Sequence, residues 1–161
     1  MSDYRIPGVS QPEQVSNRLN ERLAALIDLA ATLKHVHWNV AGEGFISIHK
    51  MLDPQVDSVR VMVDETAERI ATLGGVPEGT PGAIVKNRSW DDYPLGKASV
   101  WEHLEELEKV YAGIIESHRK AQQELSESDP VSEDLIVGQL RDLELYHWFI
   151  SAHLEDIAGE S

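Results

Sequence analysis

A segment in the first half of the chain combines helical periodicity with residues that can bind a metal. Residues 34–68 read KHVHWNVAGEGFISIHKMLDPQVDSVRVMVDETAE. Two glycines separate two stretches in which hydrophobic residues recur every three or four positions, as in amphipathic helices. His49 and Asp53 are four residues apart, as are Asp64 and Glu68, so each pair projects from one side of a helix. The segment predicts two helices joined by a turn. The second helix carries imidazole and carboxylate groups that suit iron, manganese or zinc.

The spacing along the second helix decides where a metal can bind. In one helix over residues 45–73, His49 and Asp64 are separated by about 22 Å at ~1.5 Å per residue. Metal bonds to nitrogen or oxygen are ~2.0–2.2 Å long, so these two residues of one chain cannot bind the same ion. Asp53 and Asp64 face nearly the same side, because eleven residues make about three turns. An antiparallel copy that crosses near Ser58 would place the pair at His49 beside the partner's pair at Asp64. A twofold dimer makes this contact twice, so we hypothesise two equivalent metal sites at a subunit interface.

Several motifs in and beyond this segment resemble those of one known family, the Dps proteins, which are the mini-ferritins of bacteria. The resemblance covers roughly residues 10–157. The motifs that carry it are His37-Trp38-Asn39, Gly42, Phe45, His49, Met51-Leu52-Asp53, Asp64, Ala67-Glu68-Arg69, Leu73-Gly74-Gly75, the Trp90 to Pro94 loop and His147-Trp148-Phe149.

The resemblance implies a ferroxidase centre that two subunits share. In that family the positions that match His37, His49 and Asp53 of one subunit face those that match Asp64 and Glu68 of its twofold mate. It also implies a hollow shell of twelve subunits that oxidises Fe²⁺, preferably with hydrogen peroxide, and stores Fe³⁺ as a mineral. We therefore expect an iron-sequestering ferroxidase that protects against oxidative stress.

Two further residues are candidates for supporting roles. Trp38 adjoins His37, which allows it to donate an electron to a strong oxidant; otherwise it is a core anchor, as we expect for Trp101 and Trp148. Asp134 matches acidic residues that line iron-entry pores in the resembled family. Its alternative role is compensation of the helix dipole at the start of the last helix.

The composition predicts one domain without disulfides. The chain has 161 residues, of which 42% are hydrophobic, and it has no cysteine. No apolar run approaches the ~20 residues of a membrane span, so we expect no membrane partner. The first residues lack the pattern of a signal peptide, and we therefore expect a cytoplasmic protein.

The charge distribution argues against nucleic-acid binding. The net charge is −14, Arg5 is the one basic residue within positions 1–17, and neither lysine nor arginine follows Arg141. Proteins that bind DNA need clustered cations to displace counterions from phosphate, and many Dps-like proteins carry a basic tail for this purpose. We therefore expect no DNA binding. Two alternatives stay open: a nucleoid-associated, DNA-packing protein whose metal site only holds the dimer together, and a shell that buffers zinc or manganese.

The whole chain is predicted to form an all-α, ferritin-like four-helix bundle. Amphipathic helices are expected from Pro12, from Phe45, after a Ser99/Glu102 capping box and from Pro130. The stretch from position 74 to position 96 is a long crossover between the second and third helices, flanked by two short hairpins. We divide the chain into an extended arm (residues 1–11), the bundle (12–158) and a short tail (159–161).

One proline and two histidines inside these helices have predicted structural roles. Pro54 lies inside the second helix and is expected to bend it or break its early turns. His118 and His147 lie on the hydrophobic stripes of the last two helices. Their separation of ~14 Å along the hairpin rules out a shared ion, so we expect both to be buried and hydrogen-bonded.

Overall fold

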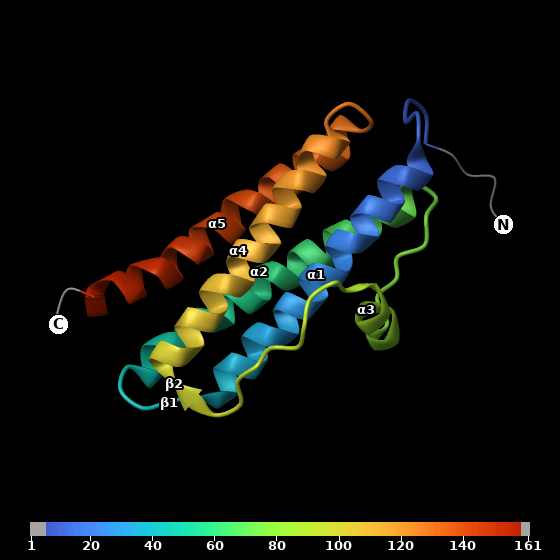
Figure 1. Cartoon of the computed structure of the whole chain (residues 1–161). Helices are drawn as coiled ribbons and strands as arrows, with labels where there is room; N and C mark the ends of the chain where they lie inside the picture. The colour runs from blue at the N-terminus through green and yellow to red at the C-terminus, as the bar shows by residue number, and fades with distance from the viewer. Residues whose placement is uncertain (1–5, 159–161) are drawn as a thin grey trace.

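The computed structural model describes the backbone of residues 6–158 and the side chains of residues 6–155. The predicted tail at 159–161 and the first five residues of the predicted arm lie outside these ranges. The four long helices are α1 (Pro12–Asn39), α2 (Phe45–Thr72), α4 (Val100–Leu125) and α5 (Pro130–Ala158). Helices α1 and α2 form one hairpin, α4 and α5 form the other, and the two hairpins pack into one elongated bundle (Figure 1). The predicted all-α, ferritin-like four-helix bundle is confirmed.

The crossover has more structure than the sequence indicated. It contains a short helix, α3 (Pro81–Asn87), whose first turn is capped by the Thr80 hydroxyl accepting from the Ala83 backbone N–H. The long crossover therefore joins α2 to α4 and includes a helix that the hydrophobic periodicity did not indicate. A seven-residue helix contains only about two turns, which is too short for a 3.6-residue period to show.

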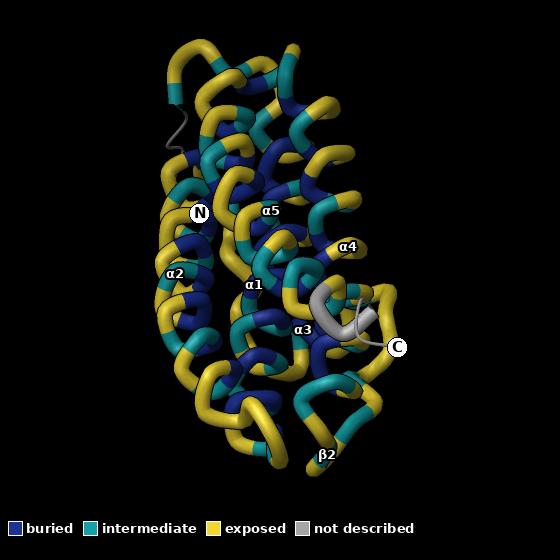
Figure 2. The backbone as a smooth tube through the Cα atoms, turned by 90° about the vertical axis from the view of Figure 1, so that its left-hand side faces the viewer, coloured by how far each residue is buried: buried dark blue, intermediate teal, exposed yellow. Residues whose placement is uncertain are grey.

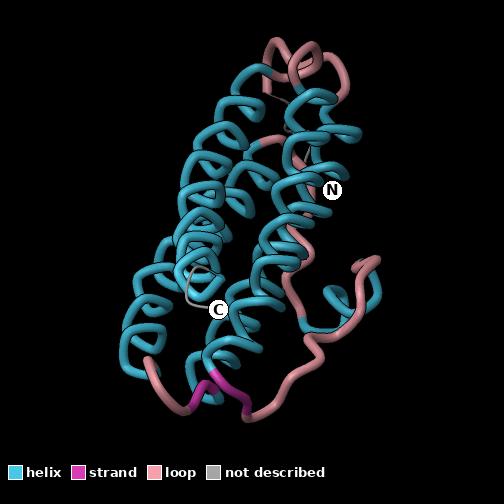
Figure 3. The backbone as a smooth tube through the Cα atoms, turned by 60° about the vertical axis from the view of Figure 1, so that its left-hand side comes forward, coloured by secondary structure: helices cyan, strands magenta, loops and turns pink. Residues whose placement is uncertain are grey.

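Two very short strands connect the crossover to the first hairpin. Strand β1 (Val40–Ala41) lies in the turn between α1 and α2, and β2 (Ala98–Ser99) immediately precedes α4. They pair in parallel, with Val40 opposite Ala98, at one end of the bundle (Figure 3). Directly after β2, the predicted capping box forms, because the Ser99 hydroxyl accepts from the Glu102 backbone N–H and the Glu102 carboxylate accepts from the Ser99 backbone N–H. The end of the crossover is thus tied to the turn that follows α1.

Pro54 does not interrupt the second helix. Helix α2 runs without a break from Phe45 to Thr72 with Pro54 inside it. Of the two outcomes predicted for Pro54, a bend or a break, the break of the early turns was therefore wrong. Buried neighbours on the helix, Leu52, Gln55 and Val56, are packed in the bundle core, and this packing offsets the hydrogen bond that proline removes.

The helices enclose two groups of buried hydrophobic residues. Buried positions recur along the length of the bundle (Figure 2). A buried hydrogen bond, in which the Tyr111 hydroxyl donates to the Gln55 amide oxygen over 2.7 Å, joins α4 to α2 within the core. The larger group includes Leu26, Leu29, Leu33, Leu52, Val59, Leu104, Leu107, Tyr111 and Leu143. The smaller group is Val15, Leu19, Leu23, Ile70, Leu73, Leu125, Ile136 and Leu140.

Several aromatic and histidine residues lie elsewhere than the sequence predicted. The side chains of Trp38 and Trp148 are 72% and 61% exposed, and Trp101 is half-buried, so none of the three is a core anchor. His147 is also only partly buried. His118 is fully buried as predicted, and its Nδ1 donates to the Ile114 carbonyl over 3.0 Å. A helix can carry hydrophobic residues on more than one side. Periodicity alone does not show which of these sides packs against the core.

Candidate metal centre

His37 and His49 orient each other through the backbone. His37 lies in the last turn of α1 and His49 in the first turns of α2, and the turn between them brings the two imidazoles into a stack with centroids 3.6 Å apart. The His37 Nδ1 bonds the His49 carbonyl oxygen over 2.8 Å, and the His49 Nδ1 bonds the His37 carbonyl oxygen over 2.9 Å. Because a carbonyl can only accept, both Nδ1 atoms carry the proton. In the neutral form of each imidazole, Nε2 then keeps the lone pair that a metal requires.

Asp53 lies against this pair. Its Oδ1 is 3.3 Å from Nδ1 of His37 and accepts a hydrogen bond of 2.7 Å from Nζ of Lys34. The hydrogen bond from Lys34 lowers the pKa of Asp53 below its ordinary value, so this carboxylate is ionised at neutral pH. The side chains of His37, His49 and Asp53 therefore form one cluster, which combines two imidazoles with an anionic carboxylate.

The other two predicted ligands lie away from this cluster. Asp64 and Glu68 are both exposed on α2, the nearer of them about 16 Å along the helix from Asp53 at ~1.5 Å per residue. Within the described part of a single chain, no group of three His, Asp or Glu side chains is arranged to hold a metal. One chain thus brings together His37, His49 and Asp53, and it presents Asp64 and Glu68 at a separate position on its surface.

The two supporting candidates are both accessible. Trp38 follows His37 along α1 and exposes most of its ring. Asp134 is exposed in the first turns of α5. Neither contacts the histidine cluster through a hydrogen bond among the described residues. The electron-donor role of Trp38 and the pore role of Asp134 remain predictions.

Lys34 belongs to the site, although the sequence did not point to it. It is nineteen residues from Asp53 in sequence, and only the closure of the α1–α2 hairpin brings the two together. The signal that was available is its position: Lys34 precedes His37 by three residues, which places both on one side of a helix.

The chain matches known proteins along nearly its whole length. A ferritin-like domain model matches residues 16–159. A Mycolicibacterium smegmatis relative, named DNA protection during starvation protein, is 49% identical, and the match covers 99% of this chain and 88% of that protein. A Haemophilus ducreyi relative, named fine tangled pili major subunit, is 46% identical over 98% of this chain and 85% of that protein. The solved structure of DpsA14 from Streptomyces coelicolor superposes with a TM-score of 0.93 at 53% identity, over 94% of this chain and 92% of the other.

These names describe different functions, so the function of this chain has to be argued from its own residues. None of the described helices combines the length and the apolar character that crossing a membrane requires. The extent and identity of these matches show that the chain belongs to the ferritin-like proteins of the Dps family.

Proposed function

We propose that the protein is a ferroxidase that oxidises Fe²⁺ at sites shared between two subunits and stores the ferric product. The observation that carries the proposal is the division of the ligands. His37, His49 and Asp53 are clustered, whereas Asp64 and Glu68 are exposed farther along α2, beyond the reach of this cluster. A twofold partner whose α2 crosses antiparallel supplies the missing half of each site.

The side chains have distinct roles in this proposal. The neutral Nε2 atoms of His37 and His49 bind the ferrous substrate, and the carboxylates of Asp53 and of the partner's pair favour the more highly charged Fe³⁺ product. The proposed oxidant is hydrogen peroxide, which takes two electrons, one from each of two Fe²⁺ ions, so that no hydroxyl radical is released. The acidic character of the chain, with a net charge of −14, favours accumulation of Fe²⁺ before oxidation.

The test of the site is a double substitution, His37→Gly with His49→Gly. We expect peroxide-dependent oxidation of Fe²⁺, followed by absorbance under anaerobic conditions, to be lost. The matched control is His153→Gly, because His153 is an exposed histidine on α5 that is remote from the cluster in sequence. Oxidation at the wild-type rate in the double variant would reject this assignment.

The same proposal includes a closed assembly, which we expect to be a dodecamer in the cytoplasm. Its support is the exposure of large hydrophobic side chains on a single chain, including Trp38, Ile46, Val61 and Trp148. Sedimentation of the metal-loaded protein as a stable monomer would contradict both the assembly and the shared site.

Asp134 is proposed to line the route by which Fe²⁺ enters the shell. Its exposure in the first turns of α5 supports this role, because a pore residue must reach solvent. Asp134→Asn should slow iron uptake into the assembled protein without changing iron oxidation by the isolated dimer. Unchanged uptake would leave Asp134 with helix-dipole compensation alone.

The alternative function is DNA packing with a structural metal site. It is favoured by one observation, the name of the M. smegmatis relative. A gel-shift assay with plasmid DNA at low salt separates the two functions, since electrostatic binding is strongest there. We expect no shift, because the chain lacks a cluster of basic residues at either end.

A further inference from the structure

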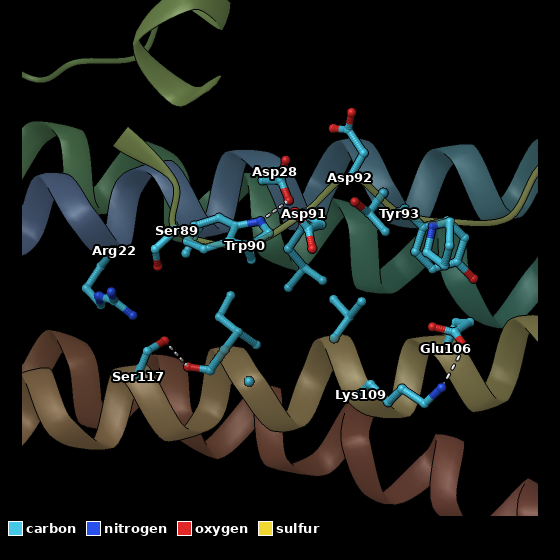
Figure 4. Close-up of a pocket in the computed structure, with 17 residues that line it drawn as sticks. Arg22, Asp28, Ser89, Trp90, Asp91, Asp92, Tyr93, Glu106, Lys109 and Ser117 are labelled. Atoms are coloured by element: carbon cyan, nitrogen blue, oxygen red, sulfur yellow. Dashed lines mark hydrogen bonds and ion pairs between the residues drawn. The ribbon is translucent and has the colours of Figure 1, made fainter. Parts of the chain in front are cut away.

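A cavity lies outside the metal centre, between α1, the segment from Ser89 to Pro94 and α4 (Figure 4). Its volume is about 390 Å³, within the range of sites for small organic molecules. One wall is apolar and the crossover adds two aromatic rings. The apolar and aromatic lining residues are Ala25, Leu29, Val110, Ile114, Trp90 and Tyr93.

A buried cation lines one end of the cavity. Arg22 is only 7% exposed, and its guanidinium extends from α1 toward α4 (Figure 4). Among the described residues, its Nε and Nη1 have no hydrogen-bond partner. Its Nη2 lies 3.9 Å from a carboxylate oxygen of Glu21, beyond hydrogen-bond distance. Burial also lowers the pKa of Arg22 from its ordinary value. A buried charge without a hydrogen-bonded partner is costly, so the ion pair with Glu21 at 3.9 Å satisfies this guanidinium only in part.

Four of the five other charged groups that line the cavity, Asp28, Asp92, Glu106 and Lys109, already have partners; the fifth is Asp91. Asp28 accepts from the Trp90 indole N–H over 2.7 Å and lies 3.3 Å from Arg88, which also bonds Asp92. Glu106 pairs with Lys109 over 2.6 Å. Arg22 is therefore the cation on the cavity wall whose N–H groups are free to donate hydrogen bonds to a ligand carboxylate. The four carboxylates that line the cavity, Asp28, Asp91, Asp92 and Glu106, repel anions, and this repulsion grows with the number of negative charges on the ligand.

A glycine leaves the cavity open. Gly113 lies inside α4 and lines the cavity, where glycine in place of alanine costs roughly 0.5–1 kcal/mol of helix stability. A Cβ built at this position meets no atom within 4 Å in the described chain. No close packing inside the chain therefore requires glycine here. Gly113 is exposed, so the absence of a side chain there leaves the edge of the cavity open.

We propose that this cavity binds a small aryl monocarboxylate. The carboxylate accepts hydrogen bonds from the Arg22 guanidinium, and the ring packs between the apolar wall of α1 and α4 and the aromatic side chains of the crossover. Arg22 and Gly113 supply the specificity: one selects for a single negative charge, and the other leaves room for a ring. This site needs neither iron nor a second subunit, so it is independent of the proposed ferroxidase centre.

The test is calorimetric titration of the full-length, assembled, iron-free protein with 2-naphthoate. The neutral isostere 2-naphthamide and inorganic phosphate serve as comparison ligands. We expect 2-naphthoate to bind at least about tenfold more tightly than the amide, because only the carboxylate pairs with Arg22. Phosphate, which lacks the ring, should bind more weakly still. Equal affinities for the acid and the amide, or tighter binding of phosphate, would overturn the proposal.

Variants locate the binding to this cavity. Arg22→Met should remove the preference for the acid over the amide, whereas Arg18→Met, a change one turn earlier at an arginine paired with Glu21 and Glu124, should leave it intact. Because Arg22→Met also removes an unsatisfied buried charge, it should not lower the thermal midpoint of the ligand-free protein. Retention of the acid preference in Arg22→Met would refute the role of the guanidinium.

A second variant keeps the test decisive if Arg22→Met does not fold. Gly113→Leu adds a bulky side chain at a residue that lines the cavity and should weaken binding of both naphthyl ligands. Its control is Gly82→Leu, at a helical glycine in α3 where an added Cβ also meets no atom within 4 Å and which does not line the cavity. Undiminished binding in Gly113→Leu, or a crystal structure in which a neighbouring subunit fills the cavity, would reject the site.

Discussion

Lys34 and Asp53 form an ion pair of 2.7 Å that joins α1 to α2 at the proposed ligand cluster. The Lys34 ammonium donates a hydrogen bond to an oxygen of Asp53, the carboxylate that we propose binds iron. A cation in this position competes with Fe²⁺ for the same oxygen and repels it. If this half-site binds iron as proposed, we expect Lys34 to set how readily it accepts its first ion.

Lys34→Met should consequently strengthen binding of the first Fe²⁺ severalfold. Anaerobic titration of the assembled protein with Fe²⁺ measures this as a lower half-saturating concentration. Lys86→Met, on the crossover helix α3, is the matched loss of one positive charge and should show little change. Weaker iron binding in Lys34→Met would mean that the ammonium orients Asp53 rather than competing with the metal.

The buried His118 should make the fold sensitive to acid. Burial, assisted by the nearby charge of Arg22, lowers the pKa of His118 from 6.5 to about 3. The folded protein keeps this imidazole neutral, whereas the unfolded chain protonates it below about pH 6.5, so the unfolded state binds more protons in this window. The free energy of unfolding should therefore fall as the pH is lowered, by at most ~1.4 kcal/mol per pH unit from this group.

His118→Gln should flatten that pH dependence. Denaturant unfolding monitored by circular dichroism between about pH 7 and about pH 4 gives the two slopes. His153→Gln, at an exposed position, should keep the wild-type slope. Identical slopes in the His118 variant and the wild type would show that His118 is already protonated in the folded state.

Asp129 should be a strong contributor to stability through one buried network. It accepts hydrogen bonds from Arg69 over 2.6 Å and from Ser132, and thereby fastens the start of α5 to the end of α2. Asp129→Asn leaves the Arg69 guanidinium without its counter-charge and should cost on the order of 3 kcal/mol. Thermal or denaturant unfolding checks this. The exposed neighbour Asp134→Asn should change stability far less, and a comparable loss there would contradict the importance of the buried pair.

Two glycines should respond in opposite ways to alanine. Gly113→Ala should stabilise the protein by about 0.5–1 kcal/mol, because the helix gains and no atom lies within 4 Å of the new methyl group. Gly75→Ala should destabilise it by roughly 1–3 kcal/mol, because its Cβ would lie 2.7 Å from the Ser16 hydroxyl and 3.0 Å from an Ile70 methyl. Denaturant midpoints of the two variants provide the comparison, and changes of equal sign would contradict it.

The long helices could be predicted because their signals are local. A proline at the first position set the starts of α1 and α5, and the Ser99/Glu102 capping box set the start of α4. The short helix α3 and the β1–β2 bridge could not be predicted. The first is shorter than the period that reveals helices, and the second depends on the crossover returning to the α1–α2 turn.

Only those features of the candidate site that depend on spacing within one helix could be predicted from the sequence. The sequence indicated that His49 and Asp64 of one chain cannot share an ion, and their positions on α2 agree with that separation. It did not reveal the pairing of Lys34 with Asp53, because that contact depends on how two helices close on each other. It also misplaced Trp38 and Trp148, since hydrophobicity alone does not distinguish a core residue from one on the outer surface.

The mutual attachment of His37 and His49 bears on how the centre tolerates change. Each imidazole is held by a main-chain oxygen of the other residue, and that oxygen is present whatever side chain the position carries. Loss of one imidazole therefore leaves the anchor of the remaining one in place. Each histidine can therefore be replaced singly, in evolution or by design, while the orientation of the other imidazole is kept.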